Sequence, residues 1–97
     1  MIYSKTTSEN VKYWVKIFKA LGNEGRLKIL KMLFGGKEYT VSEIAKEIEI
    51  SLKSTSKHLI GLCNLGFLES TGKMGRVYYK IDLFEYPKIR EILKKVF

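Results

Sequence analysis

The chain of 97 residues has room for one hydrophobic core and not for two, so we expect a single domain over residues 1–97. An apolar content of 45% excludes a disordered chain, and a net charge of +8 favours a nucleic acid or another anionic surface as partner. One cysteine excludes an intramolecular disulfide framework, and the sequence shows neither a signal-peptide pattern nor an apolar run that could span a membrane. These features predict a soluble, cytoplasmic protein without a membrane partner.

The first expected helix covers about residues 7–20, where Thr6 and Glu9 have the spacing of a capping box. Two apolar stripes run along it at helical spacing, one made of Val11, Trp14, Val15 and Phe18 and the other of Tyr13, Ile17, Ala20 and Leu21. One stripe is enough to seat a helix on its own core, so two stripes indicate cover by a second subunit. The alternative is that Tyr13 and Ile17 simply lie at the edge of the core.

Two shorter helices are expected next. Asn23 can cap a helix over about residues 24–34, which Gly35 and Gly36 end. Gly25 in its first turn weakens this helix by about 1 kcal/mol relative to alanine. Thr40 and Glu43 form a capping box at the start of a helix over about residues 41–48.

A fourth helix, over about residues 52–65, follows a tight turn and is capped by Ser51. On a helical wheel its core side holds Leu52, Thr55, Leu59, Leu62 and Cys63, and its other side holds Lys53, Ser54, Lys57, Gly61 and Asn64. The second face has no carboxylate, which suits a helix that approaches a polyanion and reads hydrogen-bonding edges in a groove. An ordinary solvated face with two lysines is the alternative.

Residues 67–81 predict a two-stranded hairpin connected by residues 72–75, with Lys73 and Arg76 near its tip. Such a ribbon can lie along a phosphate backbone or reach into a minor groove, whereas the alternative is a solvated loop with ordinary charges. Residues 51–82 carry five basic and two acidic side chains, a net charge of +3, whereas residues 37–50 carry two basic and four acidic ones, a net charge of −2. Positive charge therefore accompanies the fourth helix and the hairpin.

A last helix is expected over about residues 86–96, with Pro87 in its first turn. Its apolar residues recur at helical spacing, and such a terminal helix packs either on its own core or on a second subunit. Together with the doubly striped first helix it predicts a homodimer. The expected interface residues are Val11, Trp14, Val15, Phe18, Ile89, Leu93 and Val96.

The order of these elements and three of the segments resemble the ArsR/SmtB-type transcriptional repressors. FKALGNEGRLKILKML is similar to the family's ALADPTRLRIL segment, SLKSTSKHLIGLCNLGFLES to its recognition helix, and GRVYYKID to its second wing strand. The resemblance implies a mainly α, winged helix-turn-helix fold of order α-α-α-α-β-β-α. It also implies a homodimeric, sequence-specific regulator of transcription, a repressor, whose two recognition helices enter successive major grooves of a near-palindromic operator in double-stranded DNA. The chain departs from the family at Glu24 and Gly25, where Pro-Thr is usual.

The expected DNA contacts combine the outer face of the fourth helix, the hairpin tip and the start of the third helix. They are Thr40, Ser42, Lys53, Ser54, Ser56, Lys57, Lys73 and Arg76. His58 matches a family position, but a half-buried structural histidine is an equal alternative. Tyr78 and Tyr79 are expected to alternate between the core and the surface.

The resemblance also locates the family's metal sites, and their ligands are missing. Thr40 and Ser42 stand at the two cysteine positions of the family's E-L-C-V-C-D-L segment, and residues 83–97 contain no histidine. A dithiol switch needs two cysteines, and Cys63 is the only one. We therefore expect no metal, no other cofactor and no disulfide switch.

Two other functions are compatible with this pattern. The same fold can serve as a protein-interaction module or as an RNA-binding domain. An enzyme is not expected, because His58 and Cys63 point in different directions from one helix and no nucleophile, base and orienting group can be assembled.

Overall fold

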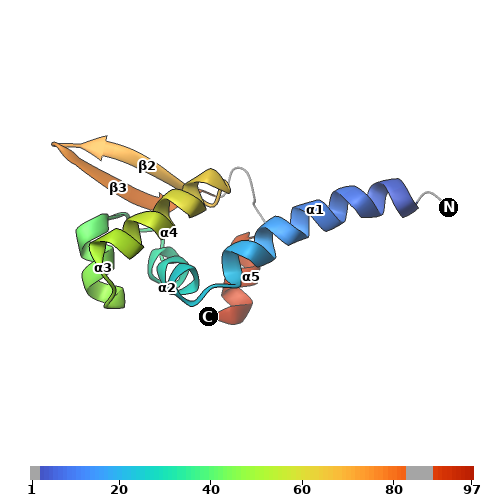
Figure 1. Ribbon diagram of the computed structural model, residues 1–97, viewed down its shortest axis with the longest axis horizontal. Coiled ribbons are helices and arrows are strands. Elements are labelled where there is room, and N and C mark those ends of the chain that lie inside the picture. The colour runs from blue at the N-terminus through green and yellow to red at the C-terminus, as the bar shows by residue number, and fades with distance from the viewer. Residues whose placement is uncertain (1–2, 83–88) are drawn as a thin grey trace.

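The computed structural model describes residues 3–82 and 89–97 and confirms a mainly helical winged helix-turn-helix fold with a small sheet (Figure 1). The helices are α1 (Tyr3–Leu21), α2 (Glu24–Leu33), α3 (Val41–Ile48), α4 (Leu52–Asn64) and α5 (Ile89–Val96). The strands are β1 (Tyr39–Thr40), β2 (Leu68–Lys73) and β3 (Arg76–Ile81). In Figure 1, α1 and the tip of the β2–β3 hairpin lie at opposite ends of the molecule, with α2, α3 and α4 between them.

Two boundaries and one strand differ from expectation. Strand β2 continues to Lys73, so the hairpin connection is shorter than the expected residues 72–75. Helix α1 already begins at Tyr3, so Thr6 and Glu9 do not mark its start. A helix extends at little cost once nucleated, and the polar residues before position 7 do not stop it. Strand β1 was not predicted as a strand, because two residues are too few to show a period. The expected first turn of the last helix, residues 86–88 with Pro87, lies outside the described residues.

Side-chain caps explain where three helices begin. The Asn23 side chain accepts a hydrogen bond from the Arg26 amide (3.0 Å), so α2 starts at Glu24 although the family's Pro-Thr is absent there. At α3, Thr40 and Glu43 form a complete capping box. The Ser51 hydroxyl accepts from the amide of Ser54 (3.0 Å) at the start of α4. Each cap satisfies an amide that the helix itself leaves without a partner.

The space beside Gly25 explains its presence in the first turn of α2. A Cβ atom at this position would lie 2.5 Å from Nε2 of His58 on α4. The glycine therefore lets α2 and α4 approach closely, and this approach offsets the helix propensity that a glycine gives up.

The sheet is antiparallel with the order β1-β3-β2. In the hairpin, Leu68 is paired with Ile81 at the base and Lys73 with Arg76 at the tip. The two connecting residues, Met74 and Gly75, both have positive φ (50° and 77°), as a type I′ turn requires. Strand β1 pairs Tyr39 with Tyr79, which ties the start of α3 to β3, the central strand of the sheet.

One core joins all five helices to the base of the hairpin. It contains Ile17, Ala20, Ile29, Leu30, Leu33, Ile44, Ile48, Leu59, Leu62, Phe67, Leu68 and Leu93. Ile17 is fully buried, so the stripe of α1 that contains it faces this core. Ile17 therefore does not lie at the edge of the core, as the alternative interpretation expected. Two predictions were wrong. Leu93 is fully buried within its own chain, and Leu52, expected on the core side of α4, is 54% exposed because it lies in the first turn, beyond the core.

Candidate nucleic-acid interface

The outward face of α4 is open to solvent. Lys53, Ser54 and Lys57 are exposed, whereas Thr55, Leu59 and Leu62 on the opposite side are buried. Neither lysine makes an ion pair with another residue that the structure describes. The buried Thr55 hydroxyl donates to the carbonyl of Ser51 (2.8 Å), so the inner face needs no water. Helix α4 thus presents two lysines without ion-pair partners and a serine hydroxyl to solvent, while its opposite side is packed in the core.

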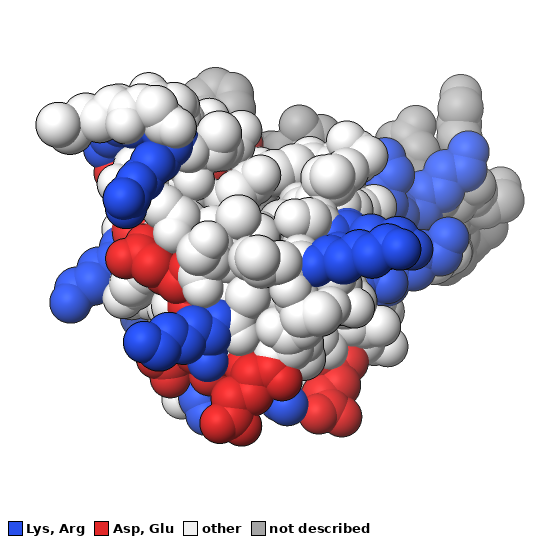
Figure 2. Space-filling model, turned by 60° about the vertical axis from the view of Figure 1, so that its left-hand side comes forward, with Lys and Arg blue, Asp and Glu red and all other residues white. Residues whose placement is uncertain are grey.

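Charge is distributed unevenly around this end of the molecule. Figure 2 turns the α3 and hairpin end of the molecule forward and shows acidic side chains gathered along the lower edge, with basic side chains on both flanks. The acidic residues of α3 and its C-cap are Glu43, Glu47 and Glu49, all exposed. A polyanion that approaches this end is attracted to the α4 and hairpin side and repelled from the edge of α3.

The cations of the hairpin are not equivalent. Lys73 forms an ion pair with Glu38 in front of β1, and its ammonium lies 5.7 Å from the centre of the Tyr78 ring. Lys80 pairs with Glu69 across the hairpin (3.2 Å). Arg76 has no ion-pair partner among residues 3–82 and 89–97 and is exposed. Arg76 is therefore the hairpin cation that is free to meet a phosphate, and the charge of Lys73 is already compensated.

Ser42 on α3 and Arg76 on β3 are far apart in the sequence but lie at the same hollow. Both line an open hollow of about 530 Å³ between the start of α3 and β3. Ser42 is exposed in the first turn of α3, where backbone amides point outwards. A hydroxyl and a guanidinium at one hollow can hold a single phosphate between them.

Thr40 lines the same hollow as Ser42 and Arg76 but is largely buried, so its expected DNA contact stays a prediction and its exposure does not support it. Its residue is only 8% exposed. The hydroxyl accepts from the Glu43 amide (3.2 Å) and donates to the Glu43 carboxylate (3.1 Å), which also accepts from the Thr40 amide (2.8 Å). The capping box visible in the sequence occupies the proton of this hydroxyl and one of its two lone pairs, so the role that the structure shows for Thr40 is to position α3.

We predict that Thr40→Ala lowers the free energy of unfolding by about 1 kcal/mol because the α3 cap is lost. Since 1 kcal/mol corresponds to about 4–8 °C in a domain of this size, thermal unfolding followed by circular dichroism measures the effect. Thr40→Ser keeps the hydroxyl and is expected to retain most of the stability. Loss of DNA affinity in Thr40→Ala at unchanged stability would return Thr40 to the contact set.

The remaining hydroxyls and the histidine are less exposed than Lys53 and Lys57. Ser56 is half-buried at the edge of the core. His58 lines a hollow of about 310 Å³ against the start of α2, together with Gly25 and Ser54. The structure therefore places His58 at the contact between α2 and α4, as expected of a structural histidine. Ser54 lines the same hollow but is exposed to solvent.

Cys63 and Tyr79 lie on the inner side of the α4–sheet contact and both pack against the core. Burial raises the pKa of the Cys63 thiol above its ordinary value, so little of the reactive thiolate exists at neutral pH. Burial, followed by the neighbouring Cys63, raises the pKa of Tyr79 as well. Tyr79 is the inward member of the tyrosine pair, whereas Tyr78 faces Lys73.

The expected interface residues fall into three groups. Val11, Val15 and Phe18 form a stripe of exposed apolar side chains on α1, and Val96 on α5 is exposed as well. Trp14 is half-buried and packs edge-on against Tyr13 at a ring-centroid distance of 5.6 Å. Leu93 belongs to the core, and the side chain of Ile89 lies outside the described part of the chain.

Three features of this end were missed by sequence reasoning. Glu38 was not expected to pair with Lys73, which lies 35 positions away along the chain. Leu52 was placed inside, and Met74, which is 99% exposed at the hairpin tip, was given no role. A two-residue hairpin turn requires positive φ, and Asn, Asp or Gly is preferred there. The unusual methionine at this position is the feature of the sequence from which a role for Met74 could have been predicted.

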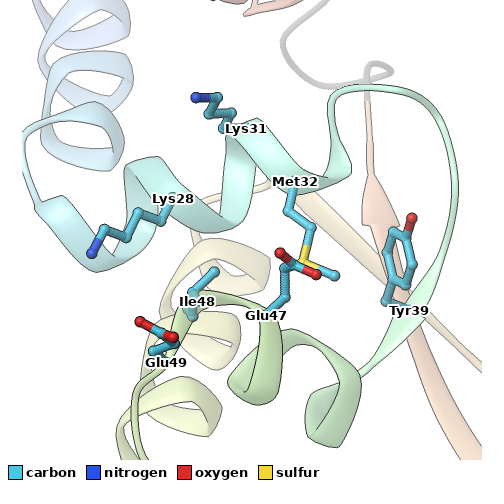
Figure 3. Close-up of a pocket in the computed structure, with 7 residues that line it drawn as sticks. All are labelled: Lys28, Lys31, Met32, Tyr39, Glu47, Ile48 and Glu49. Atoms are coloured by element: carbon cyan, nitrogen blue, oxygen red, sulfur yellow. The ribbon is translucent and has the colours of Figure 1, made fainter.

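A second hollow, of about 530 Å³, lies between α2 and α3 and is shown in Figure 3. Met32, Tyr39 and Ile48 supply its apolar lining. Lys28 and Lys31 extend away from its centre (Figure 3), and Lys28 is paired with Glu24 on its own helix (2.9 Å). The polar groups do not converge on one point, as a small-molecule site requires, so we assign no ligand to this hollow.

No set of three or more His, Cys, Asp or Glu side chains among the described residues is close enough to hold a metal ion. No helix of the described part of the chain is long and apolar enough to cross a membrane.

Comparison with known proteins decides the family. Residues 23–70, which contain α2, α3, α4 and the start of β2, match the model of the bacterial regulatory proteins of the arsR family. The chain is also similar to the transcriptional activator HlyU of Vibrio cholerae, with 31% identity over 83 residues that make up 86% of this chain and 76% of HlyU. The chain belongs to the ArsR family. It is thus a DNA-binding regulator of transcription by family, and its relatives are regulators rather than enzymes.

Other members and structures agree with this placement. The cadmium resistance transcriptional regulatory protein CadC of Listeria innocua is 37% identical over 75 residues, which are 77% of this ArsR-family chain but only 63% of CadC. The structure of reduced HlyU from Vibrio cholerae superposes with a TM-score of 0.83 at 29% identity and covers 96% of this chain and 97% of that one. The homodimeric winged helix-turn-helix domain of Mb0332 from Mycobacterium bovis gives a TM-score of 0.74 at 26% identity, covering 99% and 85% of the two chains.

Proposed function

We propose that the protein is a sequence-specific regulator that binds a near-palindromic operator in double-stranded DNA as a homodimer. The observation that carries this proposal is the outer face of α4, where Lys53, Ser54 and Lys57 are exposed and no carboxylate is present. An α-helix fits the major groove, and lysines and hydroxyls are side chains that contact phosphates and base edges there.

The other contacts follow from position and charge. We assign Arg76 and Ser42 to one backbone phosphate, because both line the same hollow. Lys73 contacts the backbone only after exchanging Glu38 for a phosphate, so its contribution is smaller than that of Arg76. Ser56, at the edge of the core, contributes at most through the flanking backbone.

The exposed apolar stripe of α1 supports the homodimer. Val11, Val15 and Phe18 are large side chains left in water by a monomer whose other α1 stripe is already in the core. A second copy of the same stripe, with Val96 of α5 beside it, removes them from solvent in a two-fold interface. The homodimeric state of Mb0332 agrees with this arrangement.

We further propose that the protein acts in the cytoplasm as a repressor, by occupying an operator that overlaps a promoter. In vitro transcription from a template that carries the operator measures the sign directly. A fall in transcript on adding the protein supports repression, whereas a rise would assign the protein the activator role that the name of HlyU states.

Selection of bound fragments from a pool of random duplex DNA tests operator binding. The expected product is a near-palindromic sequence whose half-sites lie about one helical turn, or a multiple of it, apart. An unenriched pool at low salt would contradict the proposal and point to a protein-interaction module. Tighter binding to single-stranded RNA than to duplex DNA would point to an RNA-binding domain instead.

A further inference from the structure

Met74 occupies the tip of the hairpin in a way that neither folding nor solubility explains. Met74 is 99% exposed, so its side chain contacts almost nothing else in the protein. Its backbone is left-handed, with φ of 50°, and it is followed by Gly75 with φ of 77°. A type I′ turn is most stable with Asn, Asp or Gly at the position of Met74, because other side chains are strained at positive φ. The chain therefore keeps a strained backbone in order to display an apolar side chain in water.

The surroundings of Met74 indicate what this side chain meets. Lys73 and Arg76 flank the turn and are directly paired across the hairpin. The Lys73 ammonium is paired with Glu38, whereas Arg76 has no ion-pair partner among the described residues. An apolar tip beside a free cation is complementary to an apolar surface beside an anion, and stacked bases next to a phosphate backbone are such a surface.

The reach of the hairpin supports the same partner. In Figure 1 the β2–β3 tip projects beyond the helices, at the end of the molecule farthest from α1. The base of the hairpin is fixed by buried Phe67 and Leu68, which belong to the same core as α4. If α4 occupies the major groove, the neighbouring hairpin meets the adjoining backbone and the minor groove. The minor groove is about 6 Å wide, which excludes a helix but admits a single side chain that projects from a hairpin tip.

From these observations we propose that Met74 is a wedge that enters the minor groove of the operator and partly unstacks one base step. This inference rests on the proposed operator binding and adds to it a specificity determinant outside α4. Unstacking is easiest at pyrimidine–purine steps such as TA and CA, so the protein favours such a step under each hairpin tip without any hydrogen bond to its bases. Arg76 holds the backbone beside the inserted side chain.

The test uses three variants of the full chain and the duplex that wild-type protein selects from a random pool. Met74→Asn and Met74→Gly relieve the turn and remove the apolar tip, whereas Met74→Leu keeps it. We expect the Asn and Gly variants to unfold at a higher temperature than wild type and yet to bind this duplex about tenfold more weakly, within the cost of one altered base-pair contact. The Leu variant is expected to bind like wild type. A purely structural role for Met74 does not produce weaker binding in a more stable protein.

A fluorescent base placed at the step under the tip reports the insertion itself. 2-Aminopurine at this step brightens on binding wild-type protein and the Leu variant, because unstacking relieves quenching, and stays dim with the Asn and Gly variants. Replacing the pyrimidine–purine step by an A-tract, which is stiff, weakens wild-type binding but leaves the Asn variant unchanged. Equal binding and equal brightness for all four proteins would overturn the wedge while leaving operator binding intact. If the wild-type protein enriches no duplex at all, both the proposed function and the wedge are wrong.

Discussion

Replacing Lys53 and Lys57 by alanine is expected to lower affinity for the selected operator about a hundredfold or more and to leave the fold and the dimer intact. Both side chains are exposed on α4 and neither is ion-paired with another described residue, so their removal leaves no buried group without a partner. A dimer loses four cations from the face that meets DNA. If all four contact phosphates, the log–log slope of affinity against salt becomes shallower by about 3.6.

The matched control removes the same charge from the far end of the molecule. Lys12 and Lys16 are exposed on α1, the helix that Figure 1 shows on the opposite side of the molecule from the hairpin tip. Their replacement by alanine lowers the net charge of the chain equally and is expected to change affinity by no more than a few-fold, since screening limits distant charges to about a Debye length. Equal losses in the two double variants would show that net charge, and not the α4 face, carries the binding.

Phe18→Lys is expected to convert the dimer into monomers and to lower operator affinity about a hundredfold or more, because two linked half-sites bind far better than one. Phe18 is 62% exposed in the single chain, so its replacement does not disturb the core. In the dimer each subunit supplies one Phe18, and burying the exposed part of both side chains contributes about 2–4 kcal/mol. Sedimentation velocity measures the state of association directly.

Lysine is chosen because it raises the positive charge, so a loss of DNA affinity cannot come from weaker electrostatic attraction. Phe18→Leu keeps an apolar side chain on the stripe and is expected to remain a dimer. The interface is not tested at Leu93, although the sequence favoured that position, because a charge there would enter the core of the chain itself. A dimer that persists in Phe18→Lys would move the interface away from the exposed α1 stripe.

Local signals in the sequence were sufficient for much of the fold. Asn23, Thr40 and Ser51 each precede a helix, and each makes the predicted capping hydrogen bond. Such caps depend on residues three positions apart, so they can be read without knowledge of the tertiary structure. The wheel of α4 likewise placed Lys53 and Lys57 outside, because helical period alone separates the two faces of a helix.

Long-range effects could not be read in the same way. Thr40 carries a hydroxyl that could contact a phosphate, but the capping box and the pairing of β1 with β3 bury this side chain. Lys73 has the charge of a DNA contact, yet Glu38 compensates it from a distant part of the chain. The exposure of Leu52 depends on where the core ends along α4, and the glycine at position 25 depends on the ring of His58 on another helix. All four depend on which segments meet in space, and no period in the sequence reports this.

We propose above all that the open face of α4 docks on duplex DNA through phosphate contacts. The most direct test of this docking is the affinity of wild-type protein for the selected duplex as a function of salt concentration. A dimer that makes about six phosphate contacts is expected to give a straight log–log plot with a slope of about −5. A slope near zero, or no binding to duplex DNA at low salt, would contradict the account.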